Sequence, residues 1–462
     1  MLHVRRHLSK GEEACGALPA GVGVQQHRVP GIAGLHSLSL LWPAQAFAVV
    51  DAGDFLLAAI GENRGRTARR QKIELTPPSA RGDNASSVYA ASESAMITRF
   101  RAEQVGSLLR PPELLAARAA HAAGQISLDH LRGMEDQAIL AALEKQRAIG
   151  LEVLSDGEMR RGSWLTDMAD AVDGFVPAKV TLEWKGPGGG MEGSTAQAAG
   201  AKLKKVRKLT GHELPLLKNA AQGAFKITLP APSNFVLASY KPGVTDAFYP
   251  THADLLKDLV AIVRDEVRWL VSEGVRYIQF DAPFYSHYLD PHQRDQLRAA
   301  GFDPDQELER AIAGDKAALH EVPRGKVTVA LHVCRGNSRS RWYTEGGYDA
   351  IAEKLFGLLD VDAFLLEYDS ERSGGFEPLR LVPRNKAVVL GLVTTKDGKL
   401  ESQDELRRRI DEAARYIPLE NLALSPQCGF ASVAAGNLLS IDDQWRKLEL
   451  VVETARKVWG SR

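Results

Sequence analysis

The sequence predicts an α/β protein that forms a (β/α)8 TIM barrel with an insertion, preceded by a disordered N-terminal extension. Apolar strands alternate with amphipathic helices from residue 96 onward, which is typical of a parallel sheet covered by helices. About eight strand–helix units in roughly 370 residues suit a barrel of this class. Polar residues follow directly after several strands, as they do at a barrel mouth. A doubly wound open sheet is the alternative, because its pattern is similar.

The composition is that of an ordinary globular protein, for which a small substrate is the default expectation. The chain has 462 residues, of which 44% are hydrophobic and 25% charged. Its 58 basic and 58 acidic residues balance, so neither nucleic acid nor an anionic membrane is an expected partner. Three cysteines are too few for a disulfide scaffold. This low and odd number of cysteines leads us to expect a protein of the reducing cytoplasm. No apolar run reaches the roughly 20 residues that span a bilayer.

Residues 1–95 differ from the rest of the chain. They are rich in Gly, Ala, Ser and Arg and show no helical or strand period, so they bury too little apolar area to offset their ordering entropy. We expect a disordered extension, or an upstream start that is not the biological one. A transit peptide is the alternative, although early acids such as Glu12 and Asp51 disfavour it. The folded domain is therefore predicted to cover residues 96–462.

Local signals define the elements of this domain in order. Proline in a first turn opens a helix at Pro111, and Thr251 with Asp254 forms a capping-box pattern. The other predicted helices cover 129–149, 251–274, 347–359, 403–416 and 442–459. The predicted strands are 151–154, 225–229, 277–280, 327–331, 363–367, 387–393 and one that ends near Cys428.

Residues 173–222 interrupt this alternation and are predicted to be an insertion. They contain a hairpin-like piece at 178–184 and a flexible glycine-rich loop at 186–190. The glycine-rich loop does not join a strand to a helix, and the chain has no P-loop motif. The sequence therefore gives no support for nucleotide binding.

The pattern His332-Val-Cys334 ends an apolar strand and points to a metal site. Residues two apart on a strand share a face, so the imidazole and the thiol project together. Glu367 and Cys428 also lie where apolar strands end, and a carboxylate there is costly to bury unless it is paired or ligated. One His, two Cys and one Glu suit tetrahedral Zn2+. Two buried cysteines without a ligand, or a redox pair lacking CxxC spacing, are the alternatives.

Six motifs together resemble the cobalamin-independent methionine synthase family, in its short, single-barrel form. They span nearly all of the patterned chain, and the spaced H-x-C…E…C set is the most specific of them. The motifs are residues 100–111, 155–161 with Trp164, 279–283, 332–334, 366–368 and 425–430.

This resemblance implies a zinc-dependent S-methyltransferase that makes methionine from homocysteine. It implies that zinc is held by His332, Cys334, Glu367 and Cys428. It also implies that the amino and carboxylate groups of the amino acid are held by Gly106, Ser107, Glu158 and Asp281. We expect Glu158 and Asp281 to contribute to catalysis by orienting an ammonium group rather than by acid–base chemistry.

The chain also departs from the long members of that family. It lacks their amino-terminal barrel, residues 391–397 lack the histidine that those members have, and no tryptophan occurs at 230–235. The methyl donor is therefore open between a methyl-folate and a methylcobamide (corrinoid) protein. A thiol transferase that opens an epoxide, as coenzyme M transferases do, and a non-catalytic thiol-binding barrel are the alternatives. Uroporphyrinogen decarboxylases share the general fold but need no zinc.

Overall fold

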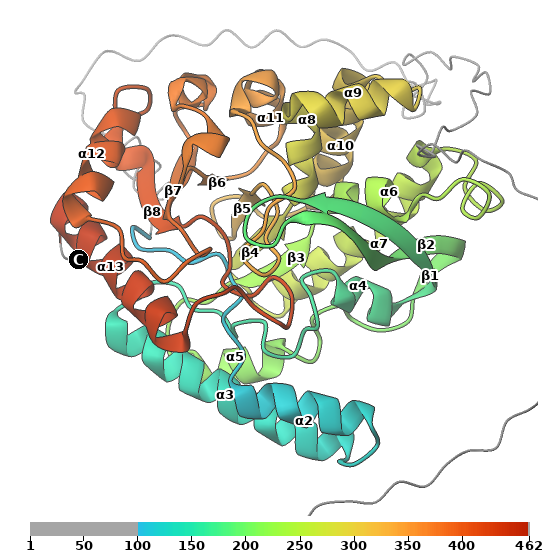
Figure 1. Cartoon of the computed structure of the whole chain (residues 1–462), viewed down its shortest axis with the longest axis horizontal. Helices are drawn as coiled ribbons and strands as arrows, with labels where there is room; N and C mark the ends of the chain where they lie inside the picture. The colour runs from blue at the N-terminus through green and yellow to red at the C-terminus, as the bar shows by residue number, and fades with distance from the viewer. Residues whose placement is uncertain (1–99, 461–462) are drawn as a thin grey trace, which may run out of the picture. The chain divides into compact units, whose positions relative to one another are not determined.

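The computed structural model describes residues 100–460, except for the side chains of 166, 167, 194 and 195 (Figure 1). The prediction of a disordered extension over residues 1–95 lies outside the described residues, and so does Cys15. No helix among residues 100–460 is both long enough and apolar enough to cross a bilayer.

Six parallel strands form the main sheet, and each is hydrogen-bonded to the next in chain order. They are buried along their whole length except for Thr328, as expected for strands covered on both faces. These strands are β3 (Ile227–Pro230), β4 (Tyr277–Asp281), β5 (Thr328–Val333), β6 (Ala363–Glu367), β7 (Ala387–Val393) and β8 (Leu422–Pro426).

Two shorter segments fill the gap between β8 and β3. Ala102 forms a parallel bridge with Leu424 of β8, and Leu154 forms one with Phe225 just before β3. The Glu152 carboxylate ties these two segments together, because it accepts hydrogen bonds from the backbone N–H groups of residues 101 and 102. The predicted TIM barrel is confirmed, but the predicted strand at 151–154 is reduced to a single bridge.

Small apolar side chains fill the inside of the barrel. Ala330, Ala363, Ala387 and Ala423 are buried there in one cluster with several larger residues. A buried polar group also lies inside, in which the Lys226 ammonium donates to Glu103 at 2.8 Å and to Gln279 at 2.9 Å. A buried charge is tolerated only when it is paired in this way.

The helices cover the outside of the sheet, and most of the long ones match the predictions. The capping box of Thr251 and Asp254 is present at the start of α7. The predicted helices are α2 (Pro112–Ala122), α3 (Leu128–Ile149), α7 (His252–Ser272), α11 (Ala352–Leu358), α12 (Gln403–Ala413) and α13 (Ile441–Trp459). Helices that were not predicted are α4 (Thr166–Ala171), α5 (Leu214–Ala220), α6 (Pro232–Ser239), α8 (Ser286–Leu289), α9 (Pro291–Ala299) and α10 (Pro304–Leu319). Single 3-10 turns are η1 (Pro283–Tyr285), η2 (Tyr348–Ala350), η3 (Glu371–Ser373), η4 (Glu377–Leu381) and η5 (Leu419–Asn421).

The insertion is an antiparallel hairpin of β1 (Val172–Trp184) and β2 (Gly190–Lys205). Its strands are longer than the piece predicted at 178–184. In Figure 1 the hairpin crosses in front of β3, β4 and β5. Its tip is fastened to the loop after β5, because the backbone of Lys185 exchanges hydrogen bonds of 2.7 and 3.1 Å with that of Trp342.

Candidate metal centre and substrate cavity

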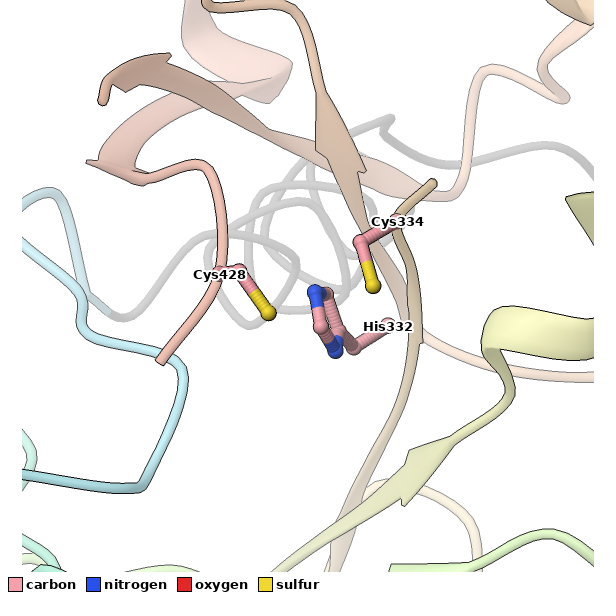
Figure 2. A group of neighbouring side chains, drawn as sticks. All are labelled: His332, Cys334 and Cys428. Atoms are coloured by element: carbon pink, nitrogen blue, oxygen red, sulfur yellow. The ribbon is translucent and has the colours of Figure 1, made fainter. Parts of the chain in front are cut away.

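Three of the four predicted metal ligands lie together at the carboxyl ends of the strands. His332 and Cys334 come from the end of β5, and Cys428 follows β8 by two residues. One ligand atom from each side chain lies within 4.8 Å of the others, and all three residues are buried. Figure 2 shows the imidazole between the two sulfur atoms. Sequence reasoning placed these groups together correctly because the ends of parallel barrel strands share one rim.

The three side chains of this cluster shift one another's pKa values. A hydrogen bond from Cys334 lowers the pKa of Cys428 well below its usual range, and His332 adds to that effect. The same bond, together with burial, raises the pKa of Cys334. Burial disfavours the charged form of His332, but its hydrogen bond with Asp281 and the neighbouring Cys428 sulfur outweigh burial and raise its pKa to about 10. Of the two thiols, Cys428 is therefore the more acidic.

The donor set fits Zn2+. Two thiolates and one imidazole nitrogen are borderline-soft ligands, and three protein ligands with an open position are typical of catalytic zinc. The Nδ1 atom of His332 is held by Asp281 at 3.1 Å, which leaves Nε2 on the side of Cys428. A carboxylate that fixes the tautomer of a ligating histidine is the usual partner of such a site. Sequence reasoning did not find this role of Asp281.

Glu367, the fourth predicted ligand, is not in the group of three. It ends β6 and is fully buried. Its carboxylate accepts hydrogen bonds from the Arg372 guanidinium at 2.7 Å and from the backbone N–H of Arg335 at 2.9 Å. Burial alone would raise the pKa of Glu367, but these positive neighbours, Arg372 foremost, lower it. The structure thus supplies the pairing that a buried carboxylate needs, and the ligand assignment of Glu367 stays a prediction.

Three of the four residues predicted to hold the amino acid substrate lie beside the candidate metal ligands. Ser107, Glu158 and Asp281 line one cavity together with His332, Cys334 and Cys428. Gly106 does not line it, but its φ of +154° and the 2.9 Å that would separate an added Cβ from the Glu158 carboxylate explain why glycine stands there.

Glu158 is strained and is only partly satisfied by protein groups. Its backbone has a φ of 54°, which is uncommon outside glycine. One carboxylate oxygen accepts a hydrogen bond from Thr228 at 3.0 Å. The other, Oε2, is buried without a hydrogen-bond partner among the described residues. An unsatisfied buried acceptor at a cavity wall is a group that a ligand's donor can satisfy.

The cavity measures about 460 Å³ and is roofed by the hairpin. Val180, Leu182 and Trp184 of β1 contribute to its wall, as do Glu192 and Ala196 of β2. Sequence reasoning gave the insertion no part in the site. The paired aromatic and branched residues of 175–184 were the available signal, but nothing local indicates over which rim a hairpin folds.

Four aromatic side chains line the same cavity as His332, Cys334 and Cys428. Trp184 meets Tyr343 edge-on with ring centroids 5.7 Å apart, and Trp164 meets Phe284 edge-on at 6.4 Å. All four rings line the cavity. Edge-to-face pairs of this kind are stable packing arrangements, so the four rings give the cavity an apolar part of its wall.

Comparison with known proteins supports a family assignment. The family model described as the cobalamin-independent synthase, catalytic domain, matches residues 245–456. The uncharacterized protein YxjG of Bacillus subtilis is 38% identical over 369 residues, which cover 78% of this chain and 95% of that protein. A methionine synthase of Sulfurisphaera tokodaii is 25% identical over 328 residues, covering 70% and 84% respectively.

A solved structure agrees in fold. The putative vitamin-B12 independent methionine synthase of Listeria monocytogenes aligns with a TM-score of 0.59 and 27% identity, over 78% of this chain and 98% of that one. The alignment thus spans nearly the whole of that protein. Together with the rim cluster and the barrel, these likenesses show that this chain belongs to the cobalamin-independent methionine synthase family.

Proposed function

We propose that this protein transfers a methyl group to the thiol of homocysteine and forms methionine, with Zn2+ as its metal. Membership of a methyltransferase family supports the reaction class. The single observation that carries the proposal is the convergence of His332, Cys334 and Cys428 on a cavity that also presents Glu158 and Asp281. One side of that cavity suits a metal, and the other suits an ammonium group.

The metal would supply one effect. Bound by His332, Cys334 and Cys428, Zn2+ would lower the pKa of the substrate thiol from its free value near 8.5, so that the sulfur is a nucleophilic thiolate at neutral pH. The sulfur then forms a bond to the methyl carbon while the bond between that carbon and its donor nitrogen or cobalt breaks, and the electron pair leaves with the donor.

The protein's own residues hold the acceptor for this transfer. The orphaned oxygen of Glu158 accepts a hydrogen bond from the substrate ammonium, and Asp281 adds negative charge beside it. The hairpin roof and the aromatic wall line this cavity, and we expect them to limit the access of water to the methyl group. Fixing two reactants in line removes much of the entropic barrier to a bimolecular step.

The test begins with metal. We expect purified protein to hold one equivalent of zinc and to methylate homocysteine from methyltetrahydrofolate or from a methylcobamide protein. Cys428→Ser should lose both zinc and activity. Cys15→Ser is the matched control and should keep both.

The outcome also separates this function from its rivals. Turnover of coenzyme M with an epoxide, and none of homocysteine with a methyl donor, contradicts the proposal and favours the thiol transferase. Tight homocysteine binding without turnover of any donor favours a non-catalytic barrel. Full zinc in Cys428→Ser rejects the ligand assignment.

A further inference from the structure

The loop after β5 is held in an unusual shape. Arg339 and Ser340 both have positive φ, at 51° and 66°, although neither is glycine. Such conformations persist only where the surroundings enforce them, and they concentrate at ligand sites. Ser340 is held on both sides by the β8 loop, because its backbone N–H donates to Asn437 at 2.9 Å and its hydroxyl accepts from the backbone of Leu438 at 2.8 Å.

A buried lysine from the β7 loop fixes the same segment. The Lys396 ammonium donates to the backbone carbonyls of Gly336 at 3.1 Å and Arg341 at 3.3 Å, and to the side chain of Asn337 at 3.1 Å. All three acceptors belong to the loop after β5. Its backbone is therefore rigid up to Arg341, the residue that follows the strained turn.

Arg341 presents a fixed guanidinium at the edge of the cavity. Its side chain is 10% exposed, its Nε donates to the Ser338 carbonyl at 3.2 Å, and its guanidinium carbon lies 5.1 Å from the centre of the Trp184 ring. It is the one lysine or arginine among the described residues that line the cavity. A desolvated guanidinium requires an anion beside it.

The anion beside Arg341 is Glu192, and the two partners differ in how firmly they are held. Glu192 belongs to hairpin strand β2 and its side chain is 48% exposed, whereas Arg341 is nearly buried. The pair therefore lies where the cavity meets solvent. The acids Glu158 and Asp281, which are proposed to bind the ammonium group, line the same cavity and are almost fully buried. We therefore assign an anionic group that reaches Arg341 to a second ligand, distinct from the amino acid whose ammonium group binds at Glu158 and Asp281.

We propose that Arg341 is the receptor for a carboxylate carried by the methyl donor, and that Glu192 occupies this receptor until the donor displaces it. The cavity is also lined by the rings of Trp164, Trp184, Phe284 and Tyr343, and such a lining favours a donor with a planar body. Arginine can bind a carboxylate through two parallel hydrogen bonds, whereas Glu192 receives one, from Nη1 of Arg341 to its Oε2, so the exchange replaces a single hydrogen bond with a bidentate pair. The inference rests on the proposed function only in calling this ligand the methyl donor.

The test is equilibrium binding, which does not depend on turnover. The probe is 4-aminobenzoyl-glutamate, a flat ring that carries carboxylates, and its uncharged diamide is the matched reference. Zinc-loaded protein should bind the acid more tightly than the diamide in calorimetric titrations. Glu192→Gln should tighten acid binding, and Arg341→Gln should weaken it, each by about tenfold or more because the hydrogen bonds are charged. Neither change should alter diamide binding.

Two surface variants serve as controls. Glu183→Gln changes an exposed carboxylate on the same hairpin, and Arg407→Gln removes an exposed arginine on α12. Neither should change the affinity for the acid. Equal affinity of the wild-type protein for acid and diamide, absence of acid binding, or an unchanged preference in Arg341→Gln each overturns the inference. None of these results bears on zinc content or thiol methylation, so the proposed function stands or falls separately.

Discussion

The imidazole Nδ1 of His332 lies 3.1 Å from the carboxylate of Asp281, its direct partner in the register of β4 and β5. The same carboxylate accepts a hydrogen bond from Gln279 at 2.8 Å. Gln279 in turn accepts one from Lys226, whose ammonium is paired with Glu103 inside the barrel. The orientation of a candidate metal ligand is therefore set by a buried polar chain that reaches the middle of the barrel.

From this chain of hydrogen bonds we expect Asp281→Asn to bind metal more weakly. The change keeps the shape of the side chain but removes the charge that orients the imidazole, and loss of such an outer partner typically costs about 10- to 100-fold in metal affinity. Competition with a chelator should show zinc affinity reduced within that range. The exposed Asp295, changed to asparagine, is the control. Unaltered zinc affinity in Asp281→Asn would falsify the orienting role and leave only contact with the substrate.

The ion pair between Arg372 and Glu367 allows a prediction about the free energy of unfolding. The carboxylate is fully buried and the arginine side chain is 11% exposed, so Arg372→Met leaves a buried charge without its main partner. Breaking such a pair from one side costs about 3–5 kcal/mol, which should appear as a lower free energy of unfolding in urea. The exposed pair Arg407 and Asp404 is the reference, and Arg407→Met should cost about 0–1 kcal/mol.

The same pair allows a test of Glu367 as a metal ligand. Glu367→Gln alone removes the charge, and combined with Arg372→Met it should recover part of the lost stability, because neither partner is then left charged and alone. Zinc content is measured on each variant. If Glu367→Gln keeps full zinc affinity while the stability coupling is present, the residue is structural and the fourth-ligand assignment is wrong.

The barrel and the three-residue rim cluster were predictable because both follow from strand periodicity. A strand that ends in His-x-Cys fixes two side chains on one face, and parallel strands bring Cys428 to the same rim. Asp281 was found by the same reasoning, as the residue directly after an apolar strand. Its contact with His332 was not predicted, because pairing register between β4 and β5 is set by packing across about 50 residues.

Other features depended on contacts that the local sequence does not show. The prediction of a regular strand at 151–154 is wrong. Leu154 forms a single bridge, and the Glu152 side chain accepts the backbone hydrogen bond of Ala102 in place of a strand carbonyl. Helices α9 and α10 were missed, and α9 has no buried residue to give an apolar stripe. The hairpin's place over the cavity follows from its tip contact with Trp342, which is far away in sequence.

The raised pKa of Asp156 leads us to expect that the free energy of unfolding depends on pH. Burial, followed by the nearby carboxylate of Glu213, raises its pKa to about 7. The folded state therefore binds this proton more tightly than the unfolded chain. The contribution to stability is complete below the unfolded value of 3.8 and is lost as the pH rises through about 7. It amounts to roughly 4 kcal/mol at most, at about 1.4 kcal/mol per pKa unit.

Asp156→Asn should remove that dependence. The amide oxygen can still accept the hydrogen bond that the Glu158 backbone N–H gives to Asp156 at 2.9 Å, so the fold is kept. Urea unfolding at several pH values between 4 and 8 is the measurement, and the difference between wild type and variant should change across this range. Asp404→Asn, at a 95% exposed position, is the control. A constant difference over the range contradicts the raised pKa.

Lys396 predicts a local effect on the loop that carries Arg341. Its ammonium binds two backbone carbonyls and one side-chain oxygen, and Lys396→Met keeps the length of the side chain while removing all three hydrogen bonds. Each buried carbonyl left without a partner costs about 1–3 kcal/mol, and the strained turn at Arg339 and Ser340 loses one of its supports. We expect a lower unfolding free energy together with a raised KM for the methyl donor.

Lys399→Met is the matched control in the same loop, because Lys399 is exposed and the ammonium that binds the loop after β5 is that of Lys396. Hydrogen exchange of residues 335–341 distinguishes a local effect from a global one, since only Lys396→Met should speed exchange there while the strands stay protected. If both lysine variants behave alike, the loop keeps its shape without Lys396, and the fixed position of Arg341 must come from Asn437 and the β8 loop.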